Sequence, residues 1–127
     1  MESGSEVDAS ADRVIGAAIE VHRNLGTRYL ESVDEETLKV EFEIPEVPFH
    51  RQLPIAVKYQ GRSVGESRLG FMVGRVLIVE LRAVDPLAGI HTAQVISDLK
   101  ATGRHLGLLI DFNVPVLKNG IKRVVLI

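Results

Sequence analysis

Two charged side chains interrupt an otherwise apolar segment of this chain, VLIVELRAV at residues 76–84. In a β-strand, alternate side chains point to the same face, so Glu80 and Arg82 share a face. An ionised carboxylate among apolar residues is costly unless a cation, a metal ion or hydrogen-bond donors compensate it. The segment therefore leaves two interpretations open. One is an internal ion pair or a partly solvated strand face, and the other is a metal site.

The composition sets the class of protein in which these charges lie. The chain has 127 residues, 46% of them hydrophobic and 25% charged, as in an ordinary globular domain. Its formal net charge of -2 gives no overall attraction to nucleic acid, so a polyanion would have to meet a local basic patch. The absence of cysteine excludes a disulfide framework, a thiolate zinc site and a cysteine nucleophile.

The first ten residues, MESGSEVDAS, are small and acidic. They predict a disordered acidic tail at residues 1–10, followed by a single domain at residues 11–127. They have neither the basic start nor the apolar core of a secretory signal, and no apolar run in the chain reaches transmembrane length. We therefore expect a cytoplasmic protein without a membrane partner.

Two helices are predicted before the first strand. Ser10 is a suitable cap, Val14 and Ala18 begin a helical apolar spacing, and Gly26 supplies a stop. A second helical pattern runs from about residue 30 to residue 42. Its first turns are acidic, which suits the positive end of the helix dipole.

Three strands should follow as an antiparallel meander, because short turns connect them. They span residues 53–59, 63–73 and 76–84. Gln60 and Gly61 predict a hairpin turn, and Gly74 predicts the second turn. Gly70 is the weak point of the middle strand.

A third helix should connect the last strand of the meander to a further pair of strands. Asp85 and Pro86 suit its start, and Gly103 suits its end. A helical crossover makes the strands on either side of it parallel, so residues 76–84 should pair in parallel with residues 106–112. With a final strand at residues 121–127, the pattern predicts an α/β (α+β) fold, in which helices flank a mixed sheet.

Six strings occur in a fixed order along this pattern. They are VIGAAIEVHRNLG, LESVDEETL, FHRQLPIAVKYQGR, VLIVELRAV, LKATG and LGLLIDFNVPVLKNGIKRVVL. In order and spacing they resemble the small bacterial GxxExxY proteins of the PD-(D/E)XK nuclease superfamily. The resemblance runs from about Asp12 to the C-terminus and implies a restriction-endonuclease-like core.

That resemblance implies a metal site and also shows where this chain departs from it. In the superfamily, an acid on one strand and an E-x-K pair on the next bring two carboxylates to Mg²⁺, and the lysine helps to orient the attacking water. Here the pair is Glu80 and Arg82, and the preceding acid falls at Gly70. Glycine cannot ligate a metal and arginine stays protonated, so the resemblance implies a degenerate nuclease site.

Two shorter signatures of related proteins are also only partly present. In the GxxExxY signature, the glycine falls at Arg28 and the tyrosine at Asp34, which leaves Glu31 as the matching acid. Related nucleases carry Q-x-x-x-Y on the helix after the E-x-K strand. Gln94 matches this pattern, but the tyrosine position holds Asp98.

We therefore predict that Glu31, Glu80, Arg82 and Gln94 converge as a vestigial catalytic site. No cofactor is expected in that case. If the protein is active, Mg²⁺ is the expected ion, with Glu80 and Glu31 as metal ligands. Glu66 is an alternative ligand, although it is displaced by roughly 13 Å along the strand from Gly70.

His91 lies one helical turn before Gln94 and has two interpretations. It belongs to the site, or it is a partly exposed helix residue that makes a hydrogen bond.

Three functions remain open. The first is a degenerate nuclease-like domain that binds nucleic acid or a protein partner, and the second is an active Mg²⁺-dependent nuclease with a rearranged ligand set. The third is a structural module that forms a homodimer through a sheet edge or an apolar helix face. The first predicts that basic residues cluster in space. The candidates are Arg62, Arg68, Arg75, Lys100, Arg104, Lys118, Lys122 and Arg123.

Overall fold

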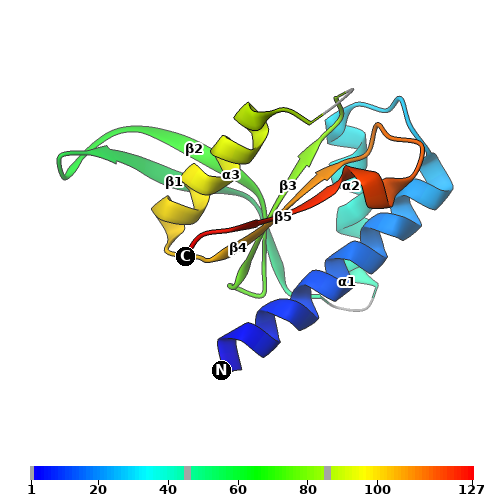
Figure 1. Ribbon diagram of the computed structural model, residues 1–127, viewed down its shortest axis with the longest axis horizontal. Coiled ribbons are helices and arrows are strands. Elements are labelled where there is room, and N and C mark those ends of the chain that lie inside the picture. The colour runs from blue at the N-terminus through cyan, green and yellow to red at the C-terminus, as the bar shows by residue number, and fades with distance from the viewer. Residues whose placement is uncertain (1, 45–46, 85–86) are drawn as a thin grey trace.

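The structure, a computed structural model, describes residues 2–44, 47–84 and 87–127. Within these residues a five-stranded sheet has the strand order β1-β2-β3-β4-β5. The helices α1 and α2 cover one face, and α3 covers the other (Figure 1). The elements are α1 (Glu2–Leu25), α2 (Glu31–Glu43), β1 (Phe49–Tyr59), β2 (Arg62–Val73), β3 (Leu77–Arg82), α3 (Gly89–Thr102), β4 (Leu106–Asp111), the short 3₁₀ helix η1 (Leu117–Gly120) and β5 (Ile121–Val125).

The first helix is longer than the sequence predicted. We expected a disordered tail before a helix that starts at Ser10, but α1 begins at Glu2. Val7 packs against the core and Ala11 is fully buried, so the apolar spacing continues ahead of Val14. Burial of this N-terminal apolar stripe stabilises the extra turns, although their polar composition suggested disorder.

The predicted ends of two helices are observed. Gly26 and Gly103 have φ values of 75° and 72°, a left-handed conformation that favours glycine. The start of α3 differs, because this helix begins at Gly89. Its first turn is closed by a hydrogen bond of 2.9 Å from the Ala88 N–H to His91 Nδ1. The predicted cap at Asp85 and Pro86 lies outside the described residues.

The predicted hairpin between β1 and β2 is present. Gln60 and Gly61 both have positive φ values, 51° and 78°, as a two-residue type I′ turn requires. The strands start earlier than predicted, at Phe49 and Arg62. Because β2 pairs with β3 only at residues 71–73, the outer part of the hairpin is a two-stranded ribbon that projects beyond the sheet (Figure 1).

The two strand pairings that define the predicted architecture are confirmed. The end of β2 is antiparallel to β3, and β3 is parallel to β4 with Glu80 opposite Leu109 and Arg82 opposite Asp111. The helix α3 makes the crossover between β3 and β4 and packs on one face of the sheet. The mixed sheet with flanking helices is therefore the α+β fold that the sequence predicted.

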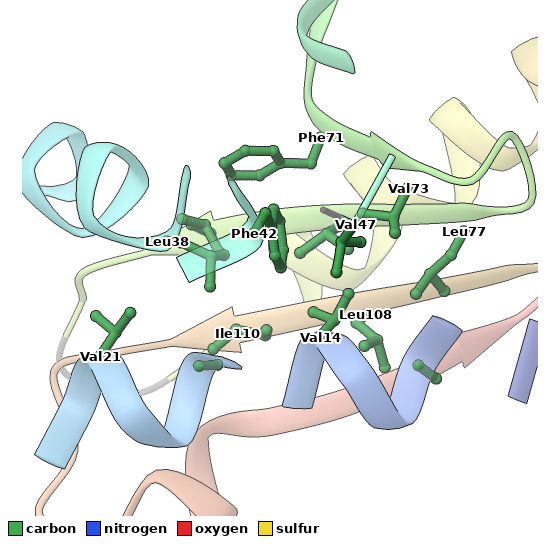
Figure 2. Close-up of a cluster of buried hydrophobic side chains, with 14 of the residues drawn as sticks. Val14, Val21, Leu38, Phe42, Val47, Phe71, Val73, Leu77, Leu108 and Ile110 are labelled. Atoms are coloured by element: carbon green, nitrogen blue, oxygen red, sulfur yellow. The ribbon is translucent and has the colours of Figure 1, made fainter. Parts of the chain in front are cut away.

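Two hydrophobic clusters hold the layers together. The larger one joins α1 and α2 to the sheet, and Figure 2 shows Val14, Leu38 and Phe42 converging on side chains from the sheet. The smaller cluster lies under α3 and includes Ile78 and Leu99. In the described part of the chain, no helix has both the length and the apolar character needed to cross a membrane.

Candidate functional site

The four predicted site residues line one cavity of about 980 Å³ beside α3 and the β1–β2 ribbon. Glu31 comes from the start of α2, Glu80 and Arg82 from β3, and Gln94 from α3. The crossover brings Gln94 over the end of β3, because α3 packs on the sheet face toward which Glu80 and Arg82 point. The structure thus gathers these side chains, while a catalytic role for them stays a prediction.

Hydrogen bonds fix the guanidinium of Arg82. Its Nη2 donates to Gln94 Oε1 at 2.7 Å, and its Nη1 donates to the backbone carbonyl of Leu81 at 2.7 Å. Glu31 Oε2 lies 4.0 Å from Nη1, an ion-pair distance. A planar guanidinium held in this way provides a permanent positive charge at the place where the resemblance puts a lysine.

Glu80 is almost completely buried, with 5% of its surface exposed. The Gly70 N–H donates to its Oε1 over 3.4 Å, and its Oε2 receives no hydrogen bond from any described donor. Burial raises the pKa of Glu80 to about 8. A hydrogen bond with the Asp98 carboxyl and the charge of Asp98 add to this rise, and Arg82 opposes it. Burial and the neighbouring Asp98 carboxyl group therefore both favour the protonated form of Glu80.

Backbone and side-chain atoms of β3 lie close to Gly70 of β2. A Cβ atom at this position would lie 3.0 Å from the Val79 carbonyl oxygen and 3.6 Å from Glu80 Oε1. The glycine is therefore more than a missing side chain, because a Cβ atom here would require the neighbouring strand to move by a few tenths of an ångström. An aspartate at position 70 would need a small shift of the strand.

The side chains around Arg82 do not fit the Mg²⁺ ion that the resemblance implies. Burial and the adjacent Asp98 raise the pKa of Glu80 to about 8, and Glu31 is directed to Arg82. Among the residues that the structure describes, no group of three His, Cys, Asp or Glu side chains is placed to hold a metal ion. A fixed guanidinium charge beside two carboxyl groups further opposes a divalent cation.

Sequence reasoning missed Asp98, and it gave Glu66 as an alternative ligand displaced along the strand. Asp98 was noted only because it replaces the tyrosine of Q-x-x-x-Y. Its spacing of four residues from Gln94 places it on the same side of α3, and this spacing could have identified it as a site residue. Glu66 lies on the ribbon, 3.5 Å from Arg68, and its side chain is 57% exposed. It does not line the cavity. His91 makes the hydrogen bond at the start of α3, in agreement with the second of its two interpretations.

The eight basic residues proposed for nucleic-acid binding do not form one patch. Arg68 and Lys100 line the cavity, whereas Arg104 and Arg123 line a separate pocket near the start of α1. Lys58 of β1, which the sequence analysis did not select, also lines the cavity. Three cations from β1, β2 and α3 therefore accompany Arg82 in one concave region.

A second group of buried acids lies outside the cavity. Asp34 of α2 is 2% exposed, and burial raises its pKa to about 6. The charge of His22 opposes this rise, and the charges of Glu31 and Asp111 add to it. Asp111 at the end of β4 is 1% exposed. Neither Asp34 nor Asp111 lines the cavity.

Comparison with known proteins agrees with the architecture. The family model of the PD-(D/E)XK nuclease superfamily matches residues 8–124. No curated protein and no solved structure matches the chain. The match spans both predicted signatures, the meander, α3 and the final strands. This chain therefore belongs to the PD-(D/E)XK nuclease superfamily.

Proposed function

We propose that this chain is a nuclease-like domain that no longer cleaves and that binds nucleic acid through the cavity beside Arg82. The observation that carries the proposal is the convergence of cations there. Lys58, Arg68 and Lys100 reach the same cavity from three elements. Lysine and arginine side chains arranged around a concave surface suit contacts with successive phosphates.

The acids that line the cavity cancel only part of the positive charge of these lysine and arginine side chains. Glu35 pairs with Arg51 at 3.7 Å, and Glu31 lies near Arg82. Glu80 is neutral near pH 7, because its pKa is about 8. Within the described part of the chain, Lys58 and Lys100 form no ion pair, so their charges are available to a polyanion.

The loss of cleavage follows from the same geometry. Mg²⁺-dependent cleavage needs carboxylates that are ionised and directed toward the ion. Gly70 supplies none, and the pKa of about 8 keeps Glu80 protonated near neutral pH. A phosphate backbone can still contact the lysines and arginines of the cavity, because those contacts need no metal.

We also assign the chain to the GxxExxY group within the superfamily. Support comes from the backbone at the position of the signature glycine. Arg28 has a φ of 76° there, a left-handed conformation that glycine adopts without strain. Glu31 occupies the position of the signature acid and lines the cavity.

Binding without a metal ion tests the function. The full chain is titrated against fluorescent single-stranded DNA, double-stranded DNA and single-stranded RNA in EDTA, with anisotropy as the readout. Lys58→Ala with Arg68→Ala should weaken the preferred probe about tenfold and reduce the salt dependence of binding by about two phosphate contacts. Lys118→Ala with Lys122→Ala removes the same charge from η1 and β5 and is the matched control.

The outcomes distinguish binding at the cavity from non-specific electrostatic binding to basic residues elsewhere on the surface. A large effect of the cavity variant and a small effect of the control supports the proposal. Equal effects of both variants, or no binding by the unmodified protein, contradicts it. Circular dichroism of each variant shows that the fold is retained.

A second candidate function rests on Asp98. Its carboxyl group faces Glu80, so two acids from different elements meet at the end of β3. This pair favours the alternative of an active nuclease with a rearranged ligand set over a purely structural module. It differs from the leading proposal in requiring metal-dependent cleavage that depends on both Glu80 and Asp98.

A further inference from the structure

One face of α2 is apolar and exposed. Leu30 at the start of the helix is 74% exposed, Val40 is 52% exposed and Ile44 just after its end is 73% exposed. Val33 lies between them along the helix and is 36% exposed. We call these four residues the α2 stripe. Contiguous exposed apolar side chains on one helix face are a feature of protein-interaction surfaces.

The spacing of the α2 stripe is that of a helix-packing seam. Intervals of three, seven and four residues place Leu30, Val33, Val40 and Ile44 on one face. The buried residues Leu38 and Phe42 lie on the opposite face and contact the core. At the remaining seam position, Thr37 donates its hydroxyl to the Val33 carbonyl at 2.8 Å, so no polar group there needs a partner.

Acids flank the α2 stripe on both sides. At 100° per residue, Glu36 and Glu43 border it on one side and Glu41 on the other. Among the residues that the structure describes, Glu41 and Glu43 form no ion pair, while Glu36 pairs with Arg51. The helix holds six acids and one lysine, so its formal net charge is -5. Lys39 is the one cation.

We propose that the α2 stripe binds an amphipathic helix of another protein, with an apolar face bordered by lysine or arginine. The apolar seam supplies the contact area, and the flanking acids select the charge of the partner. A second copy of this chain fits less well, because Glu36, Glu41 and Glu43 would then face the same acids. The surface is separate from the cavity and does not depend on nucleic-acid binding.

A library of displayed helices tests this assignment directly. The library keeps leucine, isoleucine or valine at the seam positions and varies the flanking positions among lysine, serine and glutamate. It is selected on the full chain, and the enriched sequences are then measured as synthetic peptides by fluorescence anisotropy. We expect enrichment of lysine, and at least about tenfold weaker binding for the same peptide with glutamate flanks.

Two variants locate the binding surface. Val40→Glu with Ile44→Glu should weaken the selected peptide at least about tenfold. Val64→Glu with Val125→Glu, at exposed valines of β2 and β5, is the matched control and should retain the affinity. Circular dichroism checks the fold of both.

Each outcome is decisive. Lysine enrichment with loss in the α2 variant supports the proposal. No enrichment, enrichment of glutamate, or equal binding by both variants overturns it. A concentration-dependent dimer that only the α2 variant abolishes, seen by light scattering, would also overturn it, because the occupant would be a second copy.

Discussion

Two buried carboxyl groups stand at the ends of neighbouring parallel strands, and their surroundings differ. Asp111 ends β4 and accepts backbone N–H groups from Val84 at 3.2 Å and Asn113 at 3.0 Å. Glu80, near the end of β3, receives one N–H, from Gly70 at 3.4 Å. Its second contact is another acid, Asp98. Two acids at equal depth therefore have different protein partners.

The comparison separates a structural acid from a site acid. Asp111 joins the segments that follow β3 and β4, so its hydrogen bonds stabilise the sheet edge. Glu80 borders the cavity and has few donors, so burial and Asp98 favour its protonated form. Each acid has one buried oxygen without a hydrogen bond from a described donor, so the contrast lies in the other contacts. An acid that accepts two backbone N–H groups indicates a structural role, whereas one that faces another acid in a cavity indicates a functional site.

The largest expected effect is on stability at Asp111. Asp111→Ala removes the acceptor of two partly buried backbone N–H groups and should lower the free energy of unfolding by about 2–4 kcal/mol. Urea unfolding followed by circular dichroism measures the change. Glu66→Ala, on the exposed ribbon, should change stability by no more than about 0.5 kcal/mol. Equal losses in the two variants would show that Asp111 has no special structural role.

A smaller effect is expected on the pH dependence of stability. The pKa of Glu80 is raised to about 8, so between its ordinary pKa and that value the folded state holds a proton that the unfolded state has lost. Stability therefore falls as the pH rises. The free energy of unfolding should fall by up to about 2 kcal/mol between about pH 6 and pH 8.

Glu80→Gln should flatten that slope, because glutamine stays neutral and its amide can donate to Asp98. Asp34, with a raised pKa of about 6, contributes to the pH dependence mainly below this range. Asp34→Asn is thus the control and should leave the slope between about pH 6 and pH 8 in place. Thermal melts across the pH series provide the measurement. A slope that survives Glu80→Gln would contradict the raised pKa of Glu80.

The smallest effect concerns Gly70. Gly70→Ala brings a Cβ to 3.0 Å from the Val79 carbonyl, so the strands must move slightly. We expect a loss of about 1 kcal/mol in urea unfolding. Gly65→Ala on the same strand meets no atom within 4 Å and should be neutral or slightly stabilising. Equal changes in the free energy of unfolding for the two substitutions would contradict a close approach of β3 to Gly70.

Local patterns predicted much of this fold. The turn at Gln60 and Gly61 needs only positive φ values at adjacent residues, and the helix stop at Gly103 needs one. The parallel pairing of β3 and β4 followed from the helix between them. Each of these inferences depends on neighbouring residues or on one connection.

Other features depend on packing between distant segments. The first turns of α1 are held by the contact of Val7 with the core, which the polar composition of the segment concealed. The meeting of Asp98 and Glu80 depends on how α3 rests on the sheet, and the close approach of β3 to Gly70 depends on the distance between two strands. Sequence reasoning had proposed the site residues but could not supply these distances.

The most direct test of the central claim is metal-dependent cleavage by the unmodified protein. Single- and double-stranded DNA and RNA are incubated with the full chain and Mg²⁺ or Mn²⁺, beside the variants Glu80→Ala and Asp98→Asn, and calorimetry measures Mn²⁺ binding. We predict no cleavage and no saturable binding of Mn²⁺, because Gly70 supplies no ligand and the raised pKa of Glu80 keeps its carboxyl group protonated near neutral pH. Metal-dependent cleavage that disappears in Glu80→Ala and Asp98→Asn would contradict this account and establish the rearranged active site.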